Sequence, residues 1–125
     1  MPLNTLVVED DELTCWGLMK VLSGRNCCVK VVHTAHDAVS EIHRQRYDSV
    51  FLDINLPDGN GFAIFEEIKA LAPNTKVVIM TGDDSAVNKQ KALEEGAYYF
   101  IGKPLNLAEI KEIVLSLAGS EELHS

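Results

Sequence analysis

Carboxylates follow two short apolar runs of the chain. Leu6-Val7-Val8 is followed by Glu9 and Asp10, and Val50-Phe51-Leu52 is followed by Asp53. Turn-forming residues come directly after Asp53, so we expect its carboxylate to lie on rigid backbone at the open end of a buried strand. An aspartate in that place can act as a nucleophile or as a metal ligand, and it can also simply begin a turn.

Two further apolar runs lead into residues of complementary chemistry. Thr81 follows the run at 77–80, and Lys103 comes shortly after the run at 98–101. An ammonium group directed at the acids would keep Asp53 ionised and would then bind an anion. Alone, Thr81 is equally a turn-capping residue, and Lys103 an ordinary surface lysine. Their common place behind successive apolar runs is what indicates a site.

A metal ion is expected where the acids meet. Carboxylates crowded together repel one another by roughly 1–4 kcal/mol per close pair, from water to partly buried surroundings. A divalent cation removes this repulsion, and hard oxygen ligands suit Mg²⁺. We therefore predict that Glu9, Asp10 and Asp53 bind Mg²⁺, for which Mn²⁺ can substitute. The dipole of a following helix accounts instead for the acids at Asp11 and Glu12.

Five apolar runs alternate with five segments of helical periodicity. Continuous apolar runs are typical of parallel strands that are covered on both faces. Right-handed crossovers then predict a doubly wound α/β sheet of flavodoxin-like strand order 2-1-3-4-5, with a ligand crevice beyond its carboxyl ends. Strands are expected at about 6–8, 29–32, 49–52, 77–80 and 98–101, and helices at about 13–22, 37–46, 62–71, 85–95 and 106–119.

The composition fits one domain, with a core at about 5–118 and a flexible tail at 119–125 of the 125 residues. A formal net charge of -8 disfavours direct nucleic-acid binding, which needs clustered Lys and Arg. No stretch has the length of a membrane span and no signal peptide is evident, so we predict a cytoplasmic location. Cys15, Cys27 and Cys28 lack zinc-ligand spacing and are expected to be reduced and mostly packing groups.

As a set, these motifs resemble the CheY-like receiver domain of response regulators, the phosphorylated component of bacterial two-component signalling. The likeness extends from about Leu6 to Leu117. It rests on an acidic pair at Glu9–Asp10, on Asp-x-Asn-x-Pro-x-x-x-Gly at 53–61, on Thr-Gly at 81–82 and on Lys-Pro at 103–104.

The resemblance implies roles for the residues of the predicted site. Asp53 would accept a phosphoryl group from a sensor histidine kinase or a phosphotransfer protein. Asp10 would bind Mg²⁺ directly, Glu9 through a water molecule, and Asn55 through its backbone carbonyl. The peptide bond before Pro104 would be cis, which only X–Pro bonds adopt at low cost.

The resemblance also implies a switch. Lys103 would neutralise charge on the phosphoryl group, and Thr81 would turn its hydroxyl toward it. Phe100, where other members have tyrosine, would then rotate inward, although a strand aromatic is also often plain core. This would change the surface of the segments 85–95 and 98–101 and of the last helix, where a partner or a second copy of the chain would bind.

Two other classes of protein share parts of this pattern. A Mg²⁺-dependent phosphatase with an aspartyl nucleophile also combines Asp, Thr and Lys, but its nucleophile ends the first strand and a cap domain contacts its substrate. Here Asp53 ends the third strand, and Asn55 stands where such a phosphatase has its second acid. A flavodoxin-type protein needs a hydroxyl-rich phosphate loop where this chain has acids at 9–11.

The prediction is therefore a phosphoacceptor domain rather than an enzyme acting on a separate substrate. The resemblance implies that the domain would catalyse its own phosphotransfer and dephosphorylation. The sequence leaves open whether the chain signals alone or regulates an output domain of a longer protein. It does not identify the kinase or the target.

Overall fold

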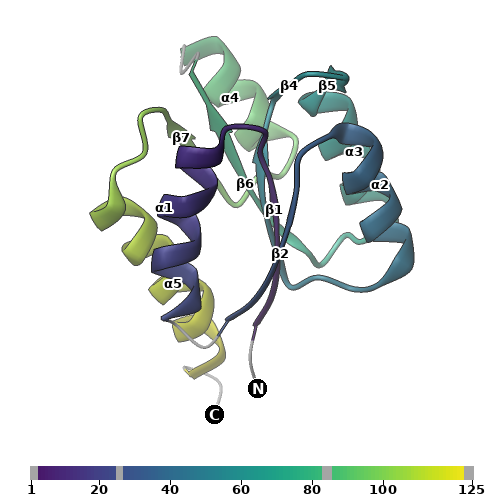
Figure 1. Cartoon of the computed structure of the whole chain (residues 1–125). Coiled ribbons are helices and arrows are strands. Elements are labelled where there is room, and N and C mark those ends of the chain that lie inside the picture. Colours follow the sequence, from purple (N-terminus) through teal and green to yellow (C-terminus); the bar gives the residue numbers. More distant parts are fainter. Residues whose placement is uncertain (1–2, 25–26, 83–85, 123–125) are drawn as a thin grey trace.

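A five-stranded parallel sheet with helices on both faces forms the centre of the fold (Figure 1). The computed structural model describes residues 3–24, 27–82 and 86–122. In chain order the elements are β1 (Leu3–Val8), α1 (Glu12–Ser23), β2 (Cys27–Val32), α2 (Ala35–Arg44), β3 (Ser49–Asp53), β4 (Asn55–Leu56), β5 (Gly59–Asn60), α3 (Gly61–Leu71), β6 (Lys76–Thr81), α4 (Ala86–Glu94), β7 (Tyr99–Gly102) and α5 (Leu107–Glu122).

The sheet has the order β2-β1-β3-β6-β7, and all neighbouring strands are parallel. In terms of the five predicted strands this is the order 2-1-3-4-5, so the predicted topology is confirmed. The short antiparallel hairpin of β4 and β5 was not predicted, because strands of two residues are too short to show any periodicity.

Most helix boundaries differ from the prediction by one or two residues, and the end of α5 differs by three. α2 begins at Ala35 instead of residue 37, because the Thr34 hydroxyl accepts a hydrogen bond from the N–H of Asp37 and caps the helix earlier. α5 continues to Glu122, past the predicted end at Gly119, since one glycine inside a helix costs only about 1 kcal/mol. The predicted first residue of the fourth helix, Ser85, lies outside the described residues.

Two apolar layers hold the helices against the sheet. Successive strand residues point to opposite faces, so Leu6 and Val8 of β1 pack with α2, α3 and α4, whereas Val7 packs with α1 and α5. Figure 1 shows α1 and α5 together on one side of the sheet and α2 and α3 on the other. Burial on both faces fixes the strands, and thus the side chains at their carboxyl ends.

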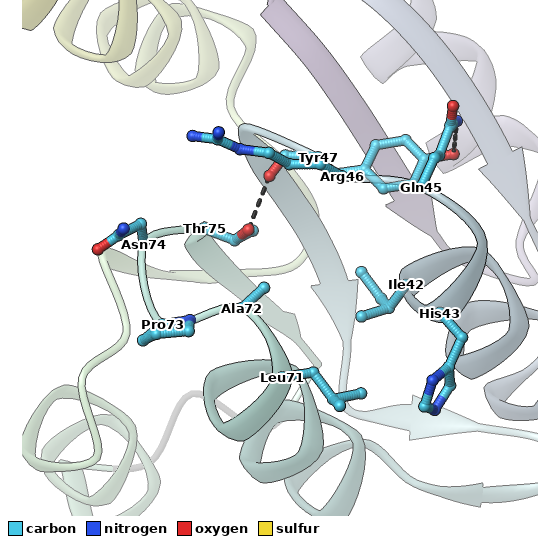
Figure 2. A pocket seen from close by; sticks show the side chains of 10 residues that line it. All are labelled: Ile42, His43, Gln45, Arg46, Tyr47, Leu71, Ala72, Pro73, Asn74 and Thr75. Atoms are coloured by element: carbon cyan, nitrogen blue, oxygen red, sulfur yellow. Dashed lines mark hydrogen bonds between the residues drawn. The ribbon is translucent and has the colours of Figure 1, made fainter.

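A hollow of about 460 Å³ lies between the carboxyl ends of α2 and α3 and the loops that lead into β3 and β6 (Figure 2). Its floor is held by the Thr75 hydroxyl, which donates to the Tyr47 carbonyl over 2.7 Å. None of the predicted site residues lines this hollow. Among the described residues, no helix is both long and apolar enough to cross a membrane.

The first residue of α3, Gly61, has no room for a side chain. A Cβ built on Gly61 would lie 2.2 Å from the Cα of Ile54 and 2.9 Å from the carbonyl oxygen of Asp53. Gly61→Ala should therefore displace the backbone behind Asp53 and lower the free energy of unfolding by at least about 2 kcal/mol, measured by urea denaturation. Gly82→Ala is the matched control, because no described atom lies within 4 Å of a Cβ built there. Equal stability of the two variants would contradict this account.

Candidate functional site

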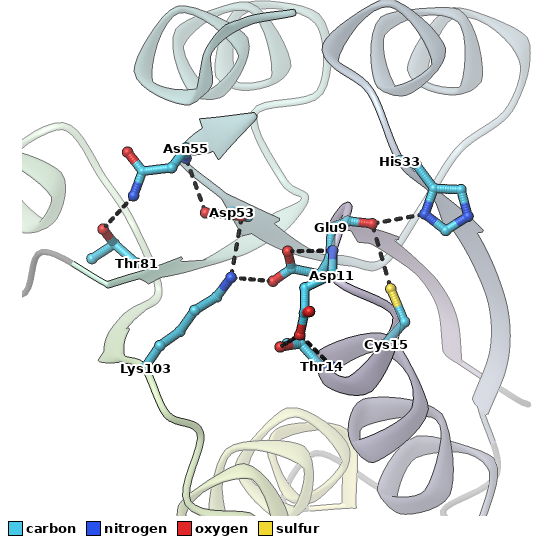
Figure 3. Close-up of polar contacts among 9 residues, drawn as sticks. All are labelled: Glu9, Asp11, Thr14, Cys15, His33, Asp53, Asn55, Thr81 and Lys103. Carbon is cyan, nitrogen blue, oxygen red and sulfur yellow. Dashed lines mark hydrogen bonds and ion pairs between the residues drawn. The ribbon is translucent and has the colours of Figure 1, made fainter. Parts of the chain in front are cut away.

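The parallel register brings the predicted residues to one edge of the sheet. Val8 pairs with Leu52, Asp53 pairs with Met80, and Thr81 pairs with Gly102. The side chains that follow or end β1, β3, β6 and β7 are therefore neighbours although they are far apart in the sequence. Figure 3 shows Glu9 and Asp53 meeting at the end of the Lys103 side chain, and Thr81 joined to Asn55 beside them.

Lys103 lies between two buried carboxylates. Its ammonium nitrogen is 2.5 Å from Oε1 of Glu9 and 3.2 Å from Oδ2 of Asp53. Glu9 is fully buried and Asp53 is 2% exposed. The peptide bond from Lys103 to Pro104 is cis. The ammonium group thus compensates two acids that the fold removes from water.

Glu9 is fixed through its backbone as well as its side chain. Its N–H donates to the carbonyl of Val32 over 3.0 Å, and its carbonyl accepts bonds from His33 Nδ1 at 2.8 Å and Cys15 Sγ at 3.4 Å. Its Oε2 accepts the N–H of Asp11 over 3.1 Å. The position of this carboxylate is therefore determined by several elements at once.

Asn55 connects the carboxylate of Asp53 to Thr81. Its backbone N–H donates to Oδ1 of Asp53 over 2.9 Å, and its side-chain Nδ2 donates to Oγ1 of Thr81 over 3.1 Å. Thr81 is fully buried. The two oxygens of Asp53 are thus oriented separately, one by Asn55 and the other by Lys103.

Phe100 is buried, at 6% exposure, and packs in the apolar layer beneath α2, α3 and α4. A hollow of about 400 Å³ lies beside it and reaches Lys103, with Lys89 of α4 and Glu109 of α5 on its walls. The strand aromatic and the site lysine therefore border the same surface depression.

The donor set suits a hard divalent cation. One carboxylate oxygen from each of Glu9, Asp10 and Asp53 lies within 4.8 Å of the others. Opposite oxygen ligands around Mg²⁺ are about 4 Å apart, so these acids can share one ion directly or through water. Oε1 of Glu9 is buried and, apart from its ion pair with Lys103, accepts no hydrogen bond in the described part of the chain. That oxygen has capacity for a further cationic contact.

Sequence reasoning placed all of these residues at the strand ends but missed several supporting contacts. It treated Cys15 as a packing group, gave His33 no role, and gave Asn55 a role only through its backbone carbonyl. All three cysteines are reduced; Cys15 is buried, Cys27 is partly buried and Cys28 is exposed, which agrees with the prediction that they are reduced and mostly packing groups. The Pro57-Asp58-Gly59 turn was the one local signal that the loop after Asp53 folds back on itself.

Burial opposes the charge of both partners in the central ion pair. It raises the pKa of Glu9 to about 7, and nearby Asp53 adds to this rise, while Lys103 and the N–H of Asp11 act in the opposite direction. Burial also lowers the pKa of Lys103, but the ion pairs with Glu9 and Asp53 outweigh it and leave that pKa above its ordinary value. The lysine therefore stays charged while Glu9 titrates near neutrality.

This shift predicts a pH-dependent stability of the metal-free protein. The pKa of Glu9 rises from 4.5 to about 7 on folding. The stabilisation that comes from protonated Glu9 is therefore complete below pH 4.5 and is lost as the pH rises through about 7. Glu9→Gln removes this titration. The free energy of unfolding of the variant minus that of wild type should therefore increase between pH 4.5 and 7.5 by up to about 3 kcal/mol. Urea denaturation in chelator-treated buffer measures it, and parallel pH profiles would refute it.

Known proteins share both the sequence pattern and the fold. Residues 5–115 match the family described as response regulator receiver domain. The chain is 33% identical over 110 residues to the transcriptional regulatory protein ZraR of Salmonella typhimurium, covering 88% of this chain and 25% of that protein. It thus spans about a quarter of that relative's length.

Two solved structures superpose on nearly the whole chain. A CheY-like response regulator receiver domain protein from Methanospirillum hungatei JF-1 has a TM-score of 0.87 and 27% identity, covering 98% of both chains. The BeF3-activated receiver domain of DrrB, from Thermotoga maritima, also has a TM-score of 0.87 and 27% identity, covering 95% of this chain and 99% of that one. The chain belongs to the response regulator receiver domain family of two-component signalling.

Proposed function

We propose that the protein is a signalling switch activated by transfer of a phosphoryl group from a histidine kinase to Asp53. The observation that carries this proposal is the placement of the Asp53 carboxylate, which ends β3 within 3.2 Å of the Lys103 ammonium and beside Glu9 and Asp10. A cation next to an oriented carboxylate can stabilise the charge that develops on a transferred phosphoryl group.

The chemistry follows from how Asp53 is held. An oxygen of its carboxylate attacks the phosphorus of a phosphohistidine, forming an O–P bond as the P–N bond breaks and the electron pair leaves with the imidazole nitrogen. The N–H of Asn55 and the ammonium of Lys103 hold the two carboxylate oxygens before the reaction. Such preorganisation lowers the barrier because little reorientation is needed during transfer. We expect the domain to catalyse its dephosphorylation in the same site.

The acids would hold Mg²⁺ or Mn²⁺ next to the nucleophile. Asp10 and Asp53 would bind through their carboxylates, Glu9 through water, and Asn55 through its backbone carbonyl. When bound, the ion supplies positive charge that reduces repulsion between the carboxylates and the incoming phosphoryl oxygens.

The expected response to phosphorylation travels through Thr81 and Phe100. The Thr81 hydroxyl, which contacts Asn55 in this structure, would turn to the phosphoryl oxygens and stabilise one packing of Phe100 and its surroundings. Leu93 of α4 and Tyr99 of β7 are exposed at the neighbouring surface. We infer that this α4–β7–α5 face binds the target or a second copy of the chain.

The partners and the setting are part of the same proposal. A sensor histidine kinase or a phosphotransfer protein would supply the phosphoryl group, in the cytoplasm. The similar proteins ZraR and PmrA are transcriptional regulatory proteins, and the chain covers 25% and 52% of their lengths. An output domain or a separate target protein would therefore receive the signal, rather than nucleic acid bound by this chain itself.

Phosphorylation of Asp53 can be tested directly. With acetyl phosphate and Mg²⁺, the wild-type protein should gain the mass of one phosphoryl group, detected by intact mass spectrometry. Asp53→Asn should abolish the gain because the amide is not a nucleophile. Asp37→Asn, which changes an exposed acid of α2, should leave the gain unchanged. Equal labelling of Asp53→Asn and wild type, or an unlabelled wild type, would refute the proposal.

The response of the α4–β7–α5 face can be tested with beryllofluoride, a mimic of the phosphoryl group. We expect the beryllofluoride complex to form dimers by light scattering and to protect amides of this face from hydrogen exchange. Leu93→Ser should reduce dimerisation at least about tenfold, as for a central apolar contact. Leu71→Ser is the control, because Leu71 is similarly exposed, at 47% against 45%, but lies on α3. Unchanged exchange and assembly would exclude this face.

A further inference from the structure

The hairpin of β4 and β5 is attached at its tip to the start of α2. Asp58, in the turn between the two strands, accepts the N–H of Ala35 on Oδ1 at 2.7 Å and the N–H of His36 on Oδ2 at 3.1 Å. A Cβ built on Gly59 would lie 3.2 Å from the Cβ of Ala35, so the turn also packs closely against the helix. The segment after the phosphoacceptor strand thus contacts α2 through both charge and packing.

This contact completes the hydrogen bonds of the α2 N-terminus. Thr34 satisfies two donors of its own helix, because its hydroxyl accepts the N–H of Asp37 and its carbonyl accepts the N–H of Ala38. The remaining donors of the first turn, at Ala35 and His36, are those that Asp58 satisfies. A carboxylate is favoured there by the helix dipole as well.

The side-chain caps of α1 and α5 come from the residue directly before the helix. Asp11 caps α1 by accepting the N–H of Thr14. Asn106 caps α5 by accepting the N–H groups of Ala108 and Glu109. At α2, in contrast, half of the capping comes from a residue more than twenty positions away, so this cap joins two parts of the fold.

The base of the same hairpin lies in the site. Asn55 begins β4, pairs with Asn60 of β5, and hydrogen-bonds to both Asp53 and Thr81. A pair of two-residue strands has too few hydrogen bonds to hold its shape alone. Its position therefore depends on what fixes its two ends.

We propose that Asp58 is a positioning residue for the phosphoryl-transfer site. By fixing the hairpin tip to α2, it holds Asn55 in contact with the Asp53 carboxylate and the Thr81 hydroxyl. The inference rests on the proposed function of Asp53, but the anchoring itself is a property of the unmodified, metal-free protein.

The decisive comparison is Asp58→Ala against Thr34→Ala. Asp58→Ala removes two side-chain hydrogen bonds from the N-terminus of α2, and Thr34→Ala removes one. Only Asp58→Ala also detaches the hairpin. In the metal-free protein, NMR hydrogen exchange should show the Asn55 amide exchanging at least about tenfold faster in Asp58→Ala, because Asn55 is no longer held against its acceptor, the carboxylate of Asp53. Thr34→Ala should change that rate less than about twofold at matched stability, which added urea can set.

The functional readout is the rate of Asp53 phosphorylation by acetyl phosphate together with the affinity for Mg²⁺. Asp58→Ala should weaken each by about tenfold, the lower part of the range for groups that orient metal ligands. Thr34→Ala should change the phosphorylation rate and the Mg²⁺ affinity less than about twofold, because it leaves the hairpin attached. Asp58→Asn keeps one acceptor oxygen, so it should lie between wild type and Asp58→Ala and serves if the alanine variant fails to fold.

The outcomes separate this inference from the proposed function. If wild type is phosphorylated but Asp58→Ala and Thr34→Ala behave alike in both readouts, the positioning role is wrong. If wild type is not phosphorylated at all, the proposed function fails, and the exchange rate of the Asn55 amide still decides whether Asp58 anchors the hairpin. Unchanged exchange in both Asp58 variants would overturn the inference by itself.

Discussion

The site depends on one electrostatic constraint, the burial of two carboxylates beside a single ammonium group. Glu9 and Asp53 are almost without solvent contact, and Lys103 is the cation that lies within ion-pair distance of both. One positive charge cannot neutralise two buried acids and the adjacent Asp10. Burial raises the pKa of Glu9 to about 7, and the neighbouring Asp53 adds a smaller rise.

This deficit of positive charge explains why the arrangement suits both a cation and a phosphoryl group. A divalent ion among the acids would restore balance, because it and Lys103 together match the charge of the three carboxylates, and the neutral site would no longer repel an incoming anion. The fold maintains the crowded carboxylates through backbone contacts that do not depend on charge. Glu9, for example, is held through its N–H and its carbonyl by Val32, His33 and Cys15. Stability of the scaffold thus offsets repulsion in the site.

The sequence allowed the topology and the strand-end residues to be predicted for a specific reason. Every central strand is a continuous apolar run, so the position where Asp53 or Thr81 ends the run is visible in the sequence itself. Parallel pairing then requires these ends to meet at one edge. The helix boundaries were less accurate, since the cap at Thr34 and the continuation through Gly119 involve small energies that neighbouring contacts can reverse.

The contacts that sequence reasoning missed are those between residues with no periodic pattern. His33 contacts the backbone carbonyl of Glu9, and Asp58 contacts backbone N–H groups of α2. The contacted groups are backbone groups, which every residue has, so no sequence motif can reveal them. Asp58 lies in a Pro-Asp-Gly turn, and the preference of turns for aspartate is enough to account for that residue type at this position. Only the position of α2 relative to the hairpin shows the second role.

The described contacts divide the site into a rigid part and an adjustable part. Glu9, Asp53 and Lys103 are attached to the sheet or directly follow it, and the sheet is covered on both faces. Asn55 instead belongs to a hairpin whose described polar contacts are to the site at one end and to α2 at the other. A receiver domain needs a nucleophile that stays in place and a neighbouring group that responds to its modification. In the proposed switch Asp53 stays fixed by β3, and Thr81, which the Asn55 side chain contacts through one hydrogen bond, is the neighbouring group that would respond.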